Sequence, residues 1–267
     1  MIVISSALVL SPVAALSLNN PLFGYLNYVT ATGIVADTEE LDYPATNLAN
    51  PLTHLQWRAA DTTAQYLTFT ISEVDPVGYV GIARHNFGSA EIAATIEAFV
   101  EGEWVEISPE QMPADDGPMI FRIEDQSVSQ IRIALTSGNE PARAAVVYIG
   151  PALVSQRRLY VGHSPLRMAR TTDVVNGMSE ASDFLGRIVL GDYVGTSIDL
   201  KNLTPDWYRA TFDPFVIAAK KAPFFFAWRP VDYPTEVGFC WLTNNPKPVN
   251  QRNNGMMSVQ LQVQGIV

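Results

Sequence analysis

The sequence predicts a mainly β protein, in which a jelly-roll β-sandwich is followed by a second β-rich domain with one or two short helices. Three observations predict this class: short alternating runs recur along the chain, turn residues separate them, and 48% of the 267 residues are hydrophobic. Only 16% are charged, which excludes an intrinsically disordered chain. Many short strands with turn signals between them are typical of sandwiches and jelly rolls.

The strands of the first half are predicted from period-2 alternation of apolar and polar side chains. They cover residues 66–71, 78–83, 94–100, 104–107, 119–123, 130–135 and 144–149. Residues 1–18 are almost wholly apolar, so a signal peptide is one interpretation. Because no Lys or Arg precedes Arg58, we expect a buried strand there instead, followed by a turn at Ser11-Pro12.

The second half predicts mixed structure. Residues 171–183 are polar and rich in Ser, Asn and Gly, which predicts a loop, and 186–200 predict strands. Thr204 and Pro205 begin a helix that runs to residue 221, with Thr204 as its cap and Pro214 kinking or splitting it. Strands are expected again at 222–229 and 237–242, and at 257–264, where one face carries glutamines.

Charge divides the chain at the breaker pair Gly150-Pro151. Residues 1–150 carry 18 acidic and 5 basic residues, whereas 151–267 carry 9 acidic and 12 basic ones. We therefore expect an N-terminal strand or arm at 1–20, a sandwich domain at 21–152 and a β-rich assembly domain at 153–267.

Composition also argues against several functions. A net charge of −10 disfavours nucleic-acid binding, and no segment has the roughly 20 apolar residues of a membrane span. The single cysteine, Cys240, excludes an internal disulfide, and with three scattered histidines it predicts neither metal nor cofactor.

No catalytic motif occurs, so we expect a protein that is not an enzyme. Adjacent carboxylates at Asp115-Asp116 and Glu39-Glu40 point apart on extended backbone, which favours a solvated face. A glycan hydrolase remains an alternative, and it would need two carboxylates about 5–10 Å apart across a cleft. Cys240 lies in an apolar strand, which favours an inert thiol over a Cys–His nucleophile.

Two short groups of polar and aromatic residues are candidates for a ligand site at one end of the sandwich. An aromatic ring with Arg and Asn nearby can stack on and hydrogen-bond a sugar. The alternative for both groups is packing and loop capping. The candidate residues are His54, Trp57, Arg58, Arg84, His85 and Asn86.

Other residues suggest contacts between proteins. The chain has 13 Arg against 4 Lys, and interfaces are enriched in Arg and aromatic residues and depleted in Lys. An acidic half and a basic half would also suit head-to-tail contacts, which generate rings or stacks. For the three consecutive phenylalanines at residues 224–226, the alternative to an interface is a strand in the core. The candidate interface residues are Arg157, Arg158, Arg167, Arg170, Phe224, Phe225, Phe226 and Trp228.

The order of short segments across residues 40–150 resembles a discoidin-like, galactose-binding-type jelly roll. These segments include Tyr43–Leu48, Trp57–Ala59, Asn86–Gly88 and Gly102–Trp104, and Val147–Gly150 closes the pattern. With the segment Tyr148–Leu153 and a second β-rich half, the whole is similar to tail-tip and baseplate proteins of long-tailed bacteriophages.

The resemblance implies a structural virion protein of the distal tail, assembled in the host cytoplasm. Its partners would be copies of itself in a ring, and the tube, hub and fibre proteins that the ring links. The alternative function is a carbohydrate-binding module that attaches the virion to a receptor glycan on the host.

Overall fold

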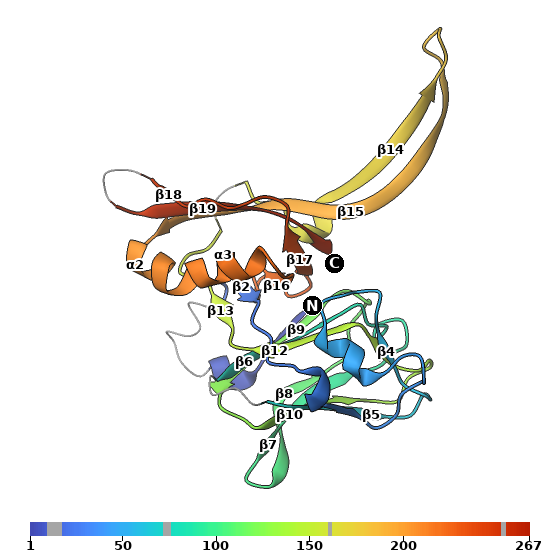
Figure 1. Cartoon of the computed structure of the whole chain (residues 1–267), viewed down its shortest axis with the longest axis vertical. Helices are drawn as coiled ribbons and strands as arrows, with labels where there is room; N and C mark the ends of the chain where they lie inside the picture. Colours follow the sequence, from blue (N-terminus) through green and yellow to red (C-terminus); the bar gives the residue numbers. More distant parts are fainter. Residues whose placement is uncertain (10–17, 72–75, 160–161, 252–254) are drawn as a thin grey trace.

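The computed structural model describes residues 1–9, 18–71, 76–159, 162–251 and 255–267, and it is mainly β, as predicted (Figure 1). Two sheets form a sandwich in the first half. One has the order β3–β5–β10–β7–β8: Ile34–Ala36, Gln65–Thr70, Gln130–Leu135, Ala94–Val100 and Glu103–Gln111. The other has the order β1–β9–β6–β12: Ile2–Ile4, Met119–Gln126, Val77–Ala83 and Val146–Gly150.

Apolar and polar residues alternate along the strands, and the apolar ones form the sandwich core. In β5, Tyr66 is exposed, whereas Leu67 and Phe69 are buried. Leu67 and Phe69 pack in one cluster with Ile133 and Phe121, which come from the two sheets. A two-stranded sheet closes one end of the sandwich, with β4 at Trp57–Arg58 and β11 at Arg143–Ala144. Single 3₁₀ turns precede it, η2 at Ala31–Gly33 and η3 at Ala45–Ala49.

The N-terminal segment contributes to both halves. β1 runs parallel to β9 and completes the four-stranded sheet, and η1 follows at Ser6–Val9. The predicted turn at Ser11-Pro12 lies outside the described residues. β2 (Leu22–Gly24) pairs instead with strands from beyond residue 150, so the two halves of the chain are interleaved.

The second half forms a third sheet, in the order β13–β2–β16–β17–β19–β15–β14 with β18 beside β19. Its strands agree with those predicted at 186–200, 222–229, 237–242 and 257–264. The bounds are Leu153–Val154 for β13, Phe224–Ala227 for β16, Val237–Leu242 for β17, Met257–Ile266 for β19, Phe184–Leu203 for β15, Arg170–Met178 for β14 and Val249–Asn250 for β18. The 3₁₀ turn η4, at Leu166–Met168, precedes β14.

The predicted helix is present in three consecutive pieces, α2 (Pro205–Trp207), the π-helical turn η5 (Tyr208–Phe212) and α3 (Asp213–Ala219). Pro214 lies in the first turn of α3, where a missing N–H is tolerated. Thr204 makes no side-chain cap. Its backbone N–H and hydroxyl instead bond the side-chain amide of Gln156, at 2.9 and 3.0 Å.

The helical segment packs against the third sheet through aromatic rings. Phe212 and Phe215 contact Phe23 of β2 with ring centroids 5.6 and 4.8 Å apart, and Phe215 meets Phe224 of β16 at 5.0 Å. Figure 1 shows the helical segment between β15–β19 on one side and β2–β16 on the other. These rings are fully buried, and they form a second core.

A third apolar layer joins the sandwich to the third sheet. Phe225 of β16 points opposite to its neighbours in the strand and packs against Tyr148 of β12 and Phe239 of β17, with centroids 5.6 and 4.9 Å away. Gly81 of β6 lies directly beneath it, because a Cβ there would come within 2.7 Å of the Phe225 ring. The two halves therefore share a buried interface.

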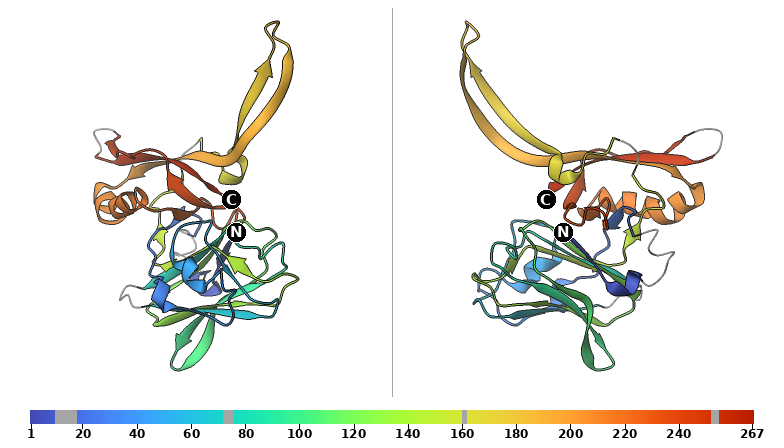
Figure 2. Two further views of the ribbon diagram at one scale, coloured as in Figure 1. Left: turned by 45° about the vertical axis from the view of Figure 1, so that its right-hand side comes forward. Right: turned by 180° about the vertical axis from the view of Figure 1, so that it is seen from behind.

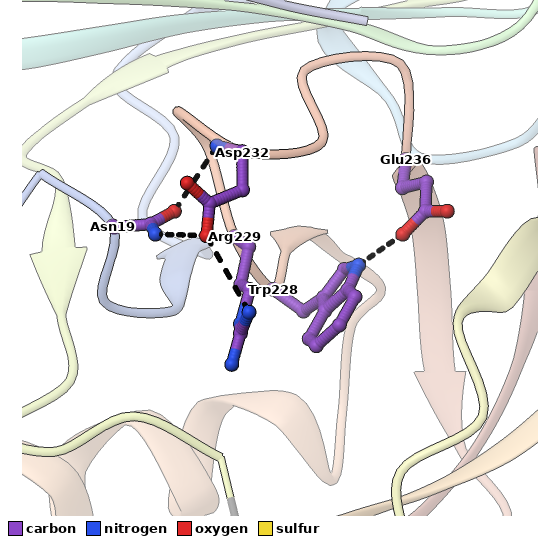
Figure 3. Close-up of polar contacts among 5 residues, drawn as sticks. All are labelled: Asn19, Trp228, Arg229, Asp232 and Glu236. Carbon is purple, nitrogen blue, oxygen red and sulfur yellow. Dashed lines mark hydrogen bonds and ion pairs between the residues drawn. The ribbon is translucent and has the colours of Figure 1, made fainter.

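A loop between β16 and β17 fastens this interface at its edge (Figure 3). Asn19 donates to the Asp232 carboxylate at 2.6 Å and accepts from the Asp232 N–H at 3.3 Å, and Arg229 lies 3.4 Å from the same carboxylate. The Trp228 indole N–H donates to Glu236. The Ile2 N–H bonds the Pro234 carbonyl, so the loop contacts two N-terminal segments.

One expectation about the second half is wrong. Residues 171–183 are not a loop: most of them form β14 and the turn that leads into β15, with Thr172 opposite Asp192 and Val175 opposite Ile188. The resulting hairpin projects far beyond the sheet and curves away from the body (Figure 2). Both of its faces are open to solvent, so its sequence lacks the alternation that marks a half-buried strand.

Candidate functional site

A pocket of about 380 Å³ opens at the end of the sandwich that β4 and β11 close. It forms where β6 ends, beside β11, the segment after η3 and the loop before β9. Its lining is polar: hydroxyl, amide, imidazole, guanidinium and carboxylate groups. The lining residues are Thr53, His54, Gln56, Arg84, His85, Asp116 and Arg143.

The backbone at the end of β6 places two of these side chains. Arg84 has a φ of 56°, in the left-handed region that residues other than Gly, Asn and Asp rarely adopt. This turns the chain sharply out of the strand, so that Arg84 is exposed while the next residue, His85, is buried. Such a conformation persists only where the surrounding structure holds it.

His85 forms the buried wall of the pocket. Its ring stacks on Phe87 with centroids 4.5 Å apart, and the Phe87 N–H donates to Nδ1 at 3.2 Å. Burial first, and then the nearby Met1 ammonium, lowers the pKa of His85 to about 4. The ring is therefore neutral near pH 7, and the proton lies on Nε2 because Nδ1 accepts.

The rest of the pocket is held by specific hydrogen bonds. Asn86 donates to the Pro141 carbonyl at 3.0 Å and accepts from the Arg143 N–H at 2.9 Å, which fixes β11 against the end of β6. Asp116 accepts from the Ser89 N–H and from the Ser89 hydroxyl, each at 2.8 Å. The pocket is thus built on strand ends and bonded loops.

The structure brings together half of the predicted ligand residues. His54, Arg84 and His85 line the pocket. Trp57 is fully buried and donates to the Thr38 carbonyl at 3.0 Å, so its ring is not available to stack on a sugar. Arg58 lies 3.4 Å from Glu40. The packing alternative therefore describes Trp57, Arg58 and Asn86.

Sequence reasoning missed four lining residues, Thr53, Gln56, Asp116 and Arg143. Thr53 and Gln56 lie within three residues of the predicted His54, so proximity was a usable signal. Arg143 reaches the site only because β11 pairs with β4, and Asp116 only because the loop before β9 folds back to Ser89.

The predicted interface residues do not form one surface. Phe224, Phe225 and Phe226 are fully buried inside the chain, so they contact no other protein in this conformation, and the core-strand alternative describes them. Trp228 is half-buried and stacks on Tyr233 at 5.2 Å. The arginines differ: Arg157, Arg158 and Arg170 are exposed, whereas Arg167 pairs with Asp115.

The apolar surface lies instead on the β14–β15 hairpin. Seven of its large apolar side chains are about half exposed or more: Val175, Met178, Phe184, Leu185, Ile188, Val189 and Leu190. From Phe184 to Tyr193, β15 pairs only with β14 among the described strands, and β14 has no other partner there. The hairpin therefore presents apolar faces and two open backbone edges.

The groups weighed for catalysis do not converge. Asp115 bonds Arg167 and the Gly117 N–H; burial alone would raise the pKa of Asp115, but these bonds outweigh it and lower the pKa. Asp116 faces Ser89 instead. Burial raises the pKa of Cys240, whose thiol is fully buried.

The described part of the chain has no cluster of three or more His, Cys, Asp or Glu side chains that could hold a metal ion. No helix in that part is both long and apolar enough to cross a membrane.

Comparison with known proteins gave likenesses to solved structures alone: no family model and no curated protein matches. One similar structure is chitosan-binding module 1 of a chitosanase/glucanase from Paenibacillus sp. IK-5 (TM-score 0.42, 13% identity, 47% of this chain and 98% of that one). Another is the family 32 carbohydrate-binding module of C. perfringens NanJ with galactose (0.40, 16%, 46% and 97%). Identities this low say nothing about a shared ligand.

Proposed function

We propose that the protein is a structural subunit that assembles with copies of itself through the β14–β15 hairpin. The exposed apolar hairpin is the observation that supports this. A two-stranded ribbon is at best marginally stable in water by itself, and monomers rarely expose contiguous apolar patches. Open strand edges also template pairing with another chain.

The setting we propose is the tail tip or baseplate of a phage, where a ring would link the tail tube to the hub or fibres. This part of the proposal rests on the sequence resemblance and on the Arg-rich, Lys-poor composition. In this role the protein is not an enzyme, and it belongs to the virion.

Sedimentation velocity over a range of concentrations tests self-assembly. We expect the wild type to form larger species, and the variant Leu185→Asp/Ile188→Asp to remain monomeric over at least a 100-fold wider concentration range, because burial of two such side chains contributes about 3–6 kcal/mol. The matched control is Leu41→Asp, at a loop side chain that is 96% exposed, and it should behave as the wild type. A hairpin variant that assembles like the control would contradict the proposal.

A second candidate function is glycan binding at the sandwich-end pocket. The observation that favours it is the set of convergent planar and hydroxyl groups, which suit the paired hydroxyls of a sugar. Since Trp57 is buried, a Trp57→Ala variant would test folding rather than binding.

A glycan array compares the wild type with His54→Ala, because His54 is exposed at the pocket mouth. Signals that the wild type gives and the variant loses would support glycan binding. An array without signal for the wild type would remove this function.

A further inference from the structure

We infer that the sandwich-end pocket takes an acidic saccharide, whose carboxylate is held by Arg84 and Arg143. This inference rests on the glycan-binding candidate and names the class of glycan. It starts from the distribution of positive charge, because the first half of the chain has only five arginines and no lysine.

Three of these five arginines do not line the pocket. Arg58 pairs with Glu40 at 3.4 Å, and Arg132 pairs with Glu97 between the rings of Tyr66 and Trp104. Arg122 is buried in the four-stranded sheet, where its Nη1 atom has no hydrogen-bond partner among the described residues.

The other two arginines line the pocket. Within the residues that the structure describes, neither Arg84 nor Arg143 has a carboxylate within 4 Å or a side-chain hydrogen bond. Of the uncompensated guanidinium groups in the acid-rich half of the chain, the two that are not buried thus lie at one site.

The acid within the pocket does not neutralise this pair. Asp116 is the single carboxylate among the described lining residues, and its two oxygens accept from Ser89. The neutral His85 adds no charge. The site therefore carries one more positive than negative charge, and an anion entering it would find guanidinium donors that no other group uses.

The donor geometry favours a carboxylate on a sugar. A guanidinium group presents a planar fork that matches a carboxylate with two parallel hydrogen bonds. Thr53 and Gln56 supply neutral donors and acceptors in the same pocket, which suit ring hydroxyls. The left-handed backbone of Arg84 and the bonded N–H of Arg143 place the backbone of both residues beside the pocket before a ligand arrives.

Calorimetric titration of the full chain tests the inference with two probes, an oligogalacturonate and the neutral galactose oligosaccharide of equal length. We expect tighter binding of the oligogalacturonate and a loss of 10-fold or more in Arg84→Gln and in Arg143→Gln, since a charge-assisted hydrogen bond contributes about 1.5–3 kcal/mol. Arg209→Gln is the matched control: this arginine is exposed on η5, makes no side-chain bond among the described residues, and its loss removes the same charge.

The possible outcomes distinguish a failure of the acidic-saccharide inference from a failure of glycan binding itself. Equal binding of both probes, with equal losses in the two variants, would overturn the acidic class and leave glycan binding standing. Binding of neither probe, together with a silent array, would overturn both. If inorganic sulfate binds as tightly as the oligogalacturonate, the pocket binds anions in general, and the inference of a saccharide ligand is overturned. Circular dichroism of each variant must match that of the wild type.

Discussion

Replacement of Phe225 by alanine tests whether the two halves of the chain form one cooperative unit. Phe225 has no exposed surface, covers Gly81 and contacts Tyr148 and Phe239 across the buried layer. Truncation of a buried Phe to Ala costs about 3–5 kcal/mol, because apolar burial is lost and a cavity remains. That is a large fraction of a typical free energy of unfolding of about 5–15 kcal/mol.

Urea denaturation followed by intrinsic fluorescence and by far-ultraviolet circular dichroism measures this loss. Phe225→Leu keeps most of the volume and should lose about 1–2 kcal/mol. Ile217→Ala, at a half-exposed position of α3, should lose less than about 0.5 kcal/mol. A loss below 1 kcal/mol for Phe225→Ala, or separate unfolding of the two halves in the wild type, would refute the reasoning.

Three further predictions concern single buried groups. The pKa of His85 is about 4 in the folded chain and 6.5 in the unfolded chain, so the neutral ring destabilises nothing above pH 6.5, and the free energy of unfolding falls as the pH drops from 6.5 to 4. Denaturation at pH 7 and at pH 4 should therefore show a smaller loss of stability for His85→Gln than for the wild type, with a difference of about 3 kcal/mol at most. An identical pH dependence would be the contrary result. Cys240 should resist thiol reagents until the chain unfolds, and rapid labelling of native protein would show the burial to be wrong. Asn19→Ala leaves the Asp232 carboxylate short of a donor and should lower the free energy of unfolding by about 1–3 kcal/mol, whereas an unchanged melting curve would mean that this contact adds nothing.

The sequence predicted best the strands that have one buried face and one exposed face. Strands such as 65–70 and 257–266 alternate because one face meets a core, and both were predicted within two residues of their bounds. The same logic failed for β14, where neither face of Arg170–Met178 is covered by the chain itself. A pattern that records burial within one chain cannot mark a strand that the chain leaves uncovered.

Long-range pairing explains the other differences. β2 lies in the sheet of the second half because Phe23 packs among Phe212, Phe215 and Phe226, and nothing local to residues 22–24 indicates this. The domain bounds at 20 and 152 remain a prediction. The pocket was half predicted for the same reason, since Arg143 joins it only through its pairing with β4.

Hydrogen exchange of the hairpin amides tests the central claim most directly. Along one edge of β15 from Phe184 to Tyr193, the N–H groups have no strand partner in the described chain, so they should exchange rapidly in dilute protein. If copies pair through the hairpin, these amides become protected as the concentration rises, while those on the exposed loop at 37–42 stay unchanged. Assembly that protects other segments and leaves 170–194 exchanging as in the monomer would contradict the account.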